Sequence, residues 1–374
     1  MTRVLIAPDK FKGSLTATEA SEAIRKGIST YDPRVEIFCH PLADGGDGSL
    51  DIIASYKTLT DVRCIASDPL GRVMMSGYKL TGETAFIELA RTSGLNLINA
   101  RDYDPEETTT LGTGQVIVDA ISKGAKEIVL LLGGSATNDV AMGIAHALGF
   151  RFFGANGVEL YPKGGNLIKV VQIKPPEVPI YEGVKFTLWT DVRNPLLGEQ
   201  GAAHVFAKQK GANNKAIQRL ELGAKNFTAI IHSDMRKEVS SVKGGGAAGG
   251  VAAGLKAFVE ANITSGLEAI MDITSFDAQL EKCDLVITGE GKLDEQSFSG
   301  KVIDGVLRKA KRFNKLLVIM TGEADINLDN QKELSAILIA RIMEVAKDKE
   351  DAMINAAHYL EKLAYDLAKE LIHE

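Results

Sequence analysis

The sequence is poor in the residues that mark a secreted, metal-thiolate or membrane-spanning protein. Its 374 residues include only three cysteines, Cys39, Cys64 and Cys283, whose odd number and wide spacing argue against a disulfide framework and a thiolate metal site. The N-terminal segment lacks the basic and then apolar form of a signal peptide. No apolar run approaches the ~20 residues that span a bilayer. We therefore expect a cytoplasmic protein with buried free thiols.

Several familiar catalytic and binding signatures are also absent. The sequence contains no G-x-x-x-x-G-K-[ST] nucleotide loop, no H-R-D or D-F-G kinase signature, no H-E-x-x-H and no G-x-S-x-G. The net charge of −6 argues against a general nucleic-acid surface, because such a surface needs clustered lysine and arginine. Any phosphotransferase activity would therefore belong to neither the P-loop class nor the protein kinase class.

The sequence does contain an alternation of strand-like and helix-like segments. The length favours two domains, and 45% hydrophobic with 25% charged residues is ordinary for a globular protein. Thr16-Ala17-Thr18-Glu19 matches a capping box, and an apolar helical face follows it. Short β-branched runs then alternate with helical patterns along most of the chain, among them a helix pattern over 138–148 with Asn138 or Thr137 as its N-cap. This alternation predicts the α/β class with parallel strands and crossover helices, without locating a domain boundary.

Loops of unusual composition follow five of the predicted strands. Four of them, at 8–14, 43–49, 133–139 and 289–297, combine glycine with acids, hydroxyl residues or lysine, and the fifth, at 190–195, has an acid, a hydroxyl residue and an arginine. In open α/β sheets, ligands bind outside the carboxyl ends of the strands. Glycine lets a backbone approach a ligand closely, carboxylates suit Mg²⁺ or a proton-accepting role, and lysine suits phosphate. The five loops favour a phosphate- and metal-handling enzyme over a binding module.

The glycine tract at 244–250 contains a formal G-x-G-x-x-G pattern. A dinucleotide site would require a strand before the tract, but residues 236–241 form a poor strand, and helix patterns follow. The small residues are better explained by the close approach of a helix N-terminus to phosphate or to a neighbouring helix.

The loop motifs together resemble the bacterial glycerate kinase family, of the type that forms 2-phosphoglycerate. The matching segments occur in the family's order: PDKFKGS at 8–14, ADGGDG at 43–48, LGGSATND at 132–139, TDVRNPL at 190–196, GAAGG at 246–250 and ITGEGKLD at 287–294. The resemblance extends from about residue 3 to about residue 320. One departure is Val140-Ala141-Met142-Gly143, where the family usually has more glycine; it bears on how closely the first helical turn approaches a ligand.

This resemblance implies ATP-dependent, Mg²⁺-assisted phosphorylation of D-glycerate to 2-phosphoglycerate, in glyoxylate, glycolate or sugar-acid catabolism. It also implies two α/β domains, one of them flavodoxin-like and inserted into the other, with the active site in the cleft between them. We expect residues 1–62 and 283–374 to form one domain and 63–282 the insert. The oligomeric state stays open, with a homodimer as one option.

The loops supply candidates for each role in phosphoryl transfer, which depends on positioning and charge neutralisation. Asp191 is the predicted general base, Lys10 and Lys12 would neutralise phosphate or the glycerate carboxylate, and Arg193 would bind the carboxylate or the transferring group. The predicted metal ligands are Asp44, Asp47, Glu290 and Asp294. The predicted nucleotide-binding residues are Gly133, Gly134, Ser135, Thr137, Asn138, Gly289, Gly291, Lys292, Ser297 and Lys301. Base and metal roles could be exchanged among the acids.

Two other functions remain open at this level. The first is a non-catalytic sensor of small organic acids, although so many uncompensated carboxylates would repel an anionic ligand. The second is a nicotinamide-dependent hydroxyacid dehydrogenase, which the glycine tract supports only weakly. The sequence also leaves open which hydroxyl group of glycerate is phosphorylated.

Overall fold

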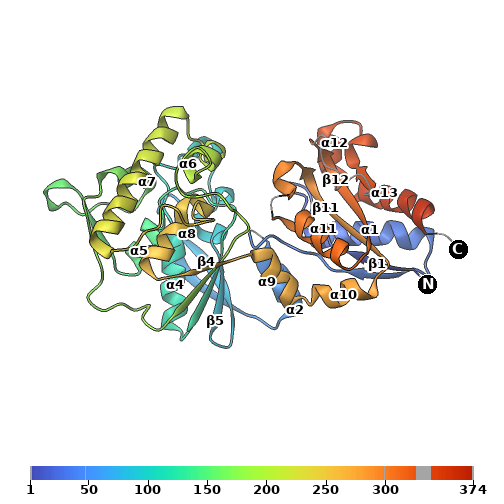
Figure 1. The fold of residues 1–374 in the computed structure, drawn as a ribbon, viewed down its shortest axis with the longest axis horizontal. Coiled ribbons are helices and arrows are strands. Elements are labelled where there is room, and N and C mark those ends of the chain that lie inside the picture. Colours follow the sequence, from blue (N-terminus) through green and yellow to red (C-terminus); the bar gives the residue numbers. More distant parts are fainter. Residues whose placement is uncertain (1, 47, 299, 326–337, 373–374) are drawn as a thin grey trace. The chain divides into compact units, whose positions relative to one another are not determined.

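The computed structural model describes residues 2–46, 48–298, 300–325 and 338–372, which form two compact units (Figure 1). The terminal unit comprises Met1–Asp44, Asp51–Tyr56 and Leu267–Glu374. The middle unit comprises Gly45–Leu50 and Lys57–Gly266. These ranges differ from the expected domains mainly at 267–282, because the helices there pack with the terminal unit.

The terminal unit is built on a five-stranded parallel sheet with the order β13-β12-β11-β1-β2. Its strands are β1 (Arg3–Ile6), β2 (Glu36–Cys39), β11 (Leu285–Leu293), β12 (Leu316–Ala324) and β13 (Leu338–Arg341). Its longer helices are α1 (Ala17–Tyr31), α11 (Val302–Arg312) and α13 (Ala356–Leu371). It also contains the shorter helices α10 (Phe276–Lys282) and α12 (Lys349–Ile354), and most of α2 (Ser49–Tyr56) and α9 (Gly266–Ile273).

The strand order of this sheet contains a topological switch point. From β1 the chain continues to β2 on one side, whereas β11, β12 and β13 follow one another on the other side. This 2-1-3-4-5 arrangement is the flavodoxin-like order, in which ligands bind at the carboxyl ends of the two strands flanking the switch. The α/β class is confirmed. The flavodoxin-like order, however, belongs to the terminal unit and not to the insert for which the resemblance implied it.

The middle unit contains a six-stranded mixed sheet with the order β10-β9-β6-β5-β4-β3. Its strands are β3 (Thr60–Ser67), β4 (Val73–Thr81), β5 (Thr84–Glu88), β6 (Glu127–Leu131), β9 (Lys185–Trp189) and β10 (Asn262–Thr264). Strands β5, β6, β9 and β10 are parallel, so their carboxyl ends share one edge of the sheet. A small antiparallel pair, β7 (Arg151–Phe153) and β8 (Gln172–Lys174), forms a separate ribbon.

Helices of very different length complete the middle unit. They are α3 (Ala90–Ser93), α4 (Leu111–Ser122), α5 (Met142–Ala147), α6 (Ala202–Phe206), α7 (Asn214–Met235) and α8 (Ala247–Phe258). Buried aliphatic and aromatic side chains such as Ile128, Leu130 and Phe227 form its core. The three cysteines of the chain are free thiols.

The predicted capping box is present at the start of α1. The Thr16 side chain accepts a hydrogen bond from the Glu19 amide, and the Glu19 carboxylate accepts one from the Thr16 amide. The helix then buries Ala20, Ile24 and Ile28 in the core of the terminal unit, against α13. The capping box therefore marks where α1 begins, and the apolar face marks the side that it buries.

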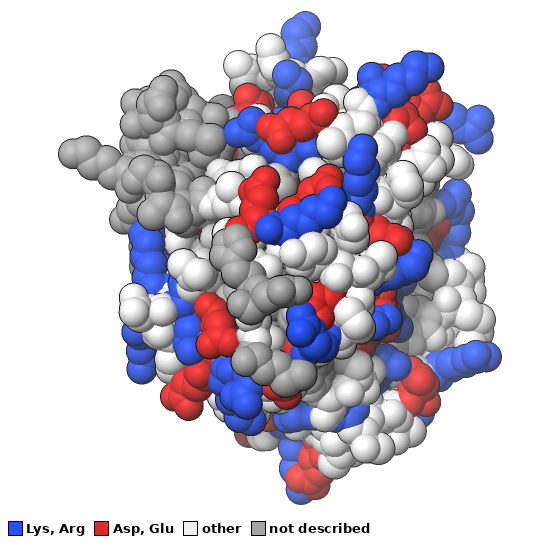
Figure 2. All heavy atoms as spheres, turned by 90° about the vertical axis from the view of Figure 1, so that its right-hand side faces the viewer, with Lys and Arg blue, Asp and Glu red and all other residues white. Residues whose placement is uncertain are grey.

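Lysine and arginine side chains are interspersed with acids on the face shown in Figure 2, and neither sign forms a separate patch there. Within the part of the chain that the structure describes, no helix has the length and apolar character needed to cross a membrane.

Candidate active site

Carboxylates gather at the switch point of the terminal unit. Asp9 lies in the loop after β1, where its amide donates to the Gly289 carbonyl of β11 at 2.8 Å and its Oδ1 accepts from the Lys10 amide at 2.7 Å. Burial raises the pKa of Asp9 well above its usual range, and the charges of Asp44 and Glu290 raise it further. Asp9, Asp44 and Glu290 therefore lie near enough to repel one another.

Glu290 is the second strongly perturbed acid at this edge. Burial raises the pKa of Glu290 to about 7; a hydrogen bond from Ser297 and the charge of Lys301 oppose the rise, whereas Asp294 and Asp44 add to it. Its Oε1 is buried and has no hydrogen-bond partner among the described residues. A buried carboxylate with an unsatisfied oxygen beside other acids is stabilised by a bound cation.

These groups suit Mg²⁺, although they do not form a complete set of metal ligands. In the described residues, no three side chains of the His, Cys, Asp and Glu types are grouped closely enough to hold a metal ion. Mg²⁺ usually keeps several waters and uses only one or two carboxylates together with substrate phosphates. One or two of Asp44, Glu290 and Asp294 would suffice for that pattern. Asp47, the fourth predicted ligand, lies outside the described residues.

Asp9 is a residue that the sequence analysis missed as a candidate. It was visible as the first acid after the first strand, much as Asp191 is the first acid after a later strand. The two lysines predicted in this loop take different places. Lys10 lies beside Asp9 and partly opposes the rise in the pKa of that carboxyl group, whereas Lys12 is exposed and lines a cavity.

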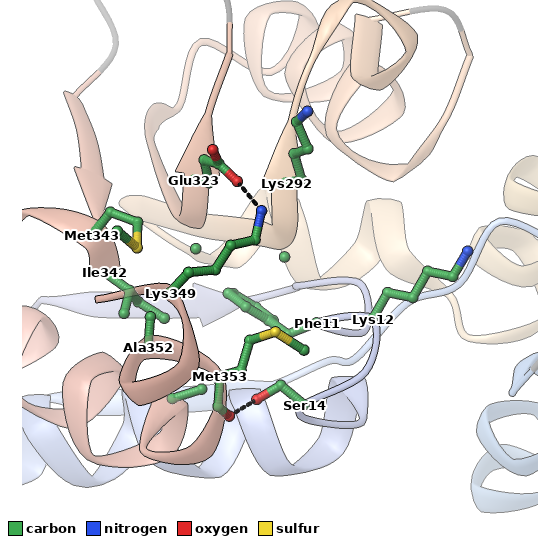
Figure 3. Close-up of a pocket in the computed structure, with 13 residues that line it drawn as sticks. Phe11, Lys12, Ser14, Lys292, Glu323, Ile342, Met343, Lys349, Ala352 and Met353 are labelled. Atoms are coloured by element: carbon green, nitrogen blue, oxygen red, sulfur yellow. Dashed lines mark hydrogen bonds and ion pairs between the residues drawn. The ribbon is translucent and has the colours of Figure 1, made fainter. Parts of the chain in front are cut away.

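The cavity has a volume of about 250 Å³ and lies in the terminal unit, at the carboxyl ends of β11 and β12 (Figure 3). The predicted residues Lys12, Gly291 and Lys292 line it. A side chain at Gly291 would place its Cβ 3.1 Å from the Lys12 amide nitrogen, so glycine allows the loop after β1 to approach the strand closely. Strand β11 continues to Leu293, so Gly289, Gly291 and Lys292 belong to the strand and not to the loop predicted after residue 288.

Most of the remaining cavity wall comes from the last 35 residues of the chain. Ile342 and Met343 lie in η8 (Ile342–Glu344), and Lys349, Ala352 and Met353 belong to α12. None of these residues was a candidate from the sequence, because apolar residues that line a cavity have the same local pattern as those in a core.

In the middle unit, a buried lysine organises the loop 133–139 after β6. Lys210, from η5 (Lys208–Lys210), donates from Nζ to Ser135 Oγ at 2.8 Å and to the Thr137 carbonyl at 2.7 Å. Burial lowers the pKa of Lys210 to about 7, against the opposing charge of Asp139. The sequence analysis missed Lys210 because it stands in a Lys-x-Lys run that is typical of a solvated surface.

The end of the same loop has an unusual backbone. Asp139 is buried, and its Oδ2 accepts hydrogen bonds from the Thr110 amide and hydroxyl and from the Gly143 amide. Val140 and Ala141 follow with φ of 50° and 59°, in the left-handed region that favours glycine. The departure from the family's glycine-rich pattern therefore puts two residues with side chains into a glycine-like conformation.

Helix α5 starts later than predicted, and this changes the expected role of the loop. Its N-cap is Ala141, without a side-chain cap, so neither Asn138 nor Thr137 caps the helix. Both atoms of the Asn138 side-chain amide and Oγ1 of Thr137 are buried without a hydrogen-bond partner among the described residues. Close to them, a Cβ on Gly249 would lie 2.0 Å from the Thr137 carbonyl oxygen. The loop thus contributes neutral polar groups in a tightly packed setting, along with Gly133, Gly134 and Ser135.

Asp191 lies two residues after β9, at the carboxyl edge of the middle sheet. Its Oδ1 accepts a hydrogen bond from the Ser265 hydroxyl at 2.6 Å, and Ser265 directly follows the neighbouring strand β10. Arg193 is exposed, and its carbonyl accepts from the Gly244 amide of the glycine tract at 3.3 Å. The tract therefore packs against the 192–195 loop, which accounts for its small residues without a dinucleotide.

Comparisons with known proteins decide the family. The sequence matches the glycerate kinase family over residues 4–372. The chain belongs to the glycerate kinase family. It is 37% identical to a glycerate kinase of Halalkalibacterium halodurans, with 98% of each chain covered, and 36% identical to the glycerate 2-kinase of Escherichia coli, covering 90% of this chain and 89% of the relative.

A solved structure gives the same family. The crystal structure of the putative glycerate kinase 2 from Salmonella typhimurium LT2 superposes with a TM-score of 0.79 and 35% identity, covering 99% of this chain and 98% of that one. The glycerate kinase family assignment therefore holds for both sequence and fold, and the chain is an enzyme.

Proposed function

We propose that this enzyme transfers the γ-phosphoryl group of ATP to the 2-hydroxyl of D-glycerate, forming 2-phosphoglycerate and ADP. The observation that carries the proposal is the carboxylate cluster of Asp9, Asp44 and Glu290 at the switch point, flanked by Lys10 and Lys301. Carboxylates that repel one another are stabilised by a bound cation such as Mg²⁺, and lysines beside them suit the phosphates of ATP. The relative named glycerate 2-kinase supports this choice of hydroxyl.

In the terminal unit, Asp44, Glu290 and Asp294 would hold Mg²⁺ directly or through water, and the charges of Asp44 and Glu290 also act on Asp9. Mg²⁺ bound there would neutralise charge on the phosphate oxygens. Lys10 and Lys301 carry the positive charge of the chain itself to the same edge of the sheet. Ser297 orients Glu290 by donating a hydrogen bond to its carboxylate.

In the middle unit, Asp191 is the proposed general base. Its carboxylate takes the proton of the glycerate hydroxyl as that oxygen forms a bond to the γ-phosphorus and the bond to the ADP oxygen breaks. The Ser265 hydroxyl holds the carboxylate in position through its 2.6 Å hydrogen bond. Arg193 and the loop 133–138 would bind the carboxylate and hydroxyl groups of glycerate, because they offer a cation and neutral donors.

The test is an assay of ADP release with D-glycerate and Mg-ATP, followed by phosphorus NMR of the product. We expect ADP release that depends on D-glycerate and a phosphorus signal of 2-phosphoglycerate. No release above background from folded protein would overturn the proposal. Exclusive formation of 3-phosphoglycerate would overturn only the choice of hydroxyl.

Two further features belong to this proposal. The three free thiols fit the reducing cytoplasm, where we place the enzyme. We also place its reaction in glyoxylate metabolism. Light scattering on the purified protein would distinguish a monomer from a homodimer.

A further inference from the structure

The cavity of the terminal unit is lined in two parts of different chemistry. Its apolar wall includes Phe11 and Ile342, which are almost fully buried, and the thioethers of Met343 and Met353 (Figure 3). Met343 and Met353 are 38% and 43% exposed, so two large apolar side chains reach solvent at one hollow. Flexible thioethers pack well against flat aromatic rings, so this wall suits a planar, apolar group.

The charged part of the lining has more lysines than acids. It consists of Lys12, Lys292 and Lys349, with Glu323 as the only acid among the described lining residues. Lys349 pairs with Glu323 at 2.9 Å, and Lys292 pairs with Asp325 at 3.2 Å. Lys12 has no ion-pair partner among the residues that the structure describes. The lining therefore suits an anion that also carries an apolar group.

The volume and position of the cavity further restrict which ligand it could bind. Its volume of about 250 Å³ lies below the ~300–1,000 Å³ of pockets that enclose a drug-sized ligand, so it would take only part of a nucleotide. The cavity lies beside the switch point, where Lys10 and the carboxylates Asp9 and Glu290 gather. A base in the cavity would leave its phosphates at the lysines, on the same sheet edge as the proposed metal ligands.

We propose that this cavity binds the adenine base of ATP, with Met343 and Met353 packing on the ring and Lys12, Lys292 and Lys349 meeting the phosphates. The proposal rests on the proposed kinase function and assigns the nucleotide to the terminal unit. It adds Phe11, Ile342, Met343, Lys349 and Met353 to the binding residues. The loop 133–138 of the middle unit is then left for the organic acid.

The test compares two neighbouring residues of α12. Met353 lines the cavity, whereas Ile354 does not and is 73% exposed. We expect Met353→Asp to weaken binding of a non-hydrolysable ATP analogue at least about tenfold by calorimetry, since an apolar contact with the base is replaced by a charge that repels phosphate. The matched control Ile354→Asp should bind like the wild type. The KM for D-glycerate should change little in either variant.

A second, independent readout locates the base directly. Photolabelling of the wild-type enzyme with 2-azido-ATP, followed by peptide mapping, should modify residues within 342–356, and excess ATP should prevent it. Lys349→Met, at an exposed position, should weaken analogue binding even if Met353→Asp fails to fold.

The outcomes separate this proposal from the kinase assignment. Turnover of D-glycerate with unchanged analogue affinity in Met353→Asp and Lys349→Met, or a label confined to the loop 133–138, would overturn the cavity proposal alone. Labelling of 342–356 without any turnover would support the cavity and count against the proposed reaction. Equal competition by an aromatic acid that lacks phosphate would show that the cavity takes another ligand, and would also overturn it.

Discussion

The two units bury different combinations of charge at the carboxyl edges of their sheets. In the terminal unit, Asp9 and Glu290 have raised pKa values, each raised further by the charge of Asp44, and the buried Oε1 of Glu290 has no partner among the described residues. In the middle unit, burial also raises the pKa of Asp139 and leaves its Oδ1 without a partner among the described residues, but its Oδ2 accepts hydrogen bonds and the opposite charge of Lys210 acts on it. Like charges at the terminal edge favour a bound cation, whereas the middle edge supplies a cation from the chain itself.

This difference has a physical basis. A buried charge is tolerated when hydrogen bonds replace its hydration, and the groups it bonds then become rigid. Where carboxylates meet without such partners, their pKa values rise and a bound cation is favoured. Buried charge alone therefore does not mark a ligand site. The sign of the neighbouring charges distinguishes the two edges, because acids meet acids in the terminal unit and Asp139 acts on Lys210 in the middle unit.

The largest expected effect concerns Asp191, an acid of the middle unit that is only half buried. Asp191→Asn keeps the shape and removes the proton acceptor, so turnover should fall about 10²–10⁴-fold while nucleotide affinity stays unchanged. Steady-state kinetics and calorimetry would measure both. Ser265→Ala, which removes only the hydroxyl partner, is the control and should cost less. Near wild-type turnover in Asp191→Asn would shift the base to Glu290 or Asp294 in the terminal unit.

The next effect tests whether a cation binds in the terminal unit. Glu290→Gln removes a charge from the carboxylate cluster, and the Mg²⁺ concentration for half-maximal activity should rise roughly 10–100-fold.

The same variant tests the pH dependence of stability. Because burial raises the pKa of Glu290 to about 7, the folded state binds more protons than the unfolded state at pH values between the ordinary pKa of glutamate and 7. Wild-type stability should therefore fall over that range relative to Glu290→Gln.

A suitable control for Glu290→Gln is Glu36→Gln, which removes an exposed acid paired with Arg3 on the edge strand β2. It should alter neither the Mg²⁺ requirement nor the pH dependence of unfolding. An unchanged Mg²⁺ requirement in Glu290→Gln would mean that the metal binds elsewhere.

The third prediction concerns the pH dependence of stability in the middle unit. The pKa of Lys210 is lowered to about 7, so the unfolded chain binds more protons than the folded one above that pH. Wild-type stability relative to Lys210→Met should therefore rise from about pH 7 toward pH 10, by at most about 1.4 kcal/mol per pH unit. Denaturant unfolding at several pH values would measure it. Lys208→Met, at an exposed position of the same turn, should show no such trend.

The smallest effect separates backbone strain in the two units. Ala248 in the middle unit has φ of 52°, and Ala248→Gly should stabilise the fold by about 0.5 kcal/mol, because glycine adopts this conformation without steric cost. Asn314 in the terminal unit also has φ of 52°, but asparagine tolerates that region, so Asn314→Gly should change little. Equal changes in the two variants, measured by denaturant unfolding, would show that the left-handed backbone at Ala248 is not strained.

Much of the local structure could be predicted from the sequence. The capping box at Thr16 and Glu19 is confirmed, because both partners lie within one helical turn. The placement of Asp191 after a strand is also confirmed, since a short apolar run before polar residues is a local signal. Its role as base stays a prediction. The start of α5 was wrong because Val140 and Ala141 adopt a backbone that their residue types disfavour.

By itself, the sequence determined the α/β class, the positions of most strands and, through ordered loop motifs, the family. These features depend on periodicity and turn chemistry within a few neighbouring residues. Only the tertiary structure decided that Lys210 is buried, that Asp9 meets Asp44 and Glu290, and that Phe11 shares a cavity with Met353. Burial and electrostatic interaction depend on which residues are neighbours in space, and residues far apart in the chain carry no local pattern that reveals their contact.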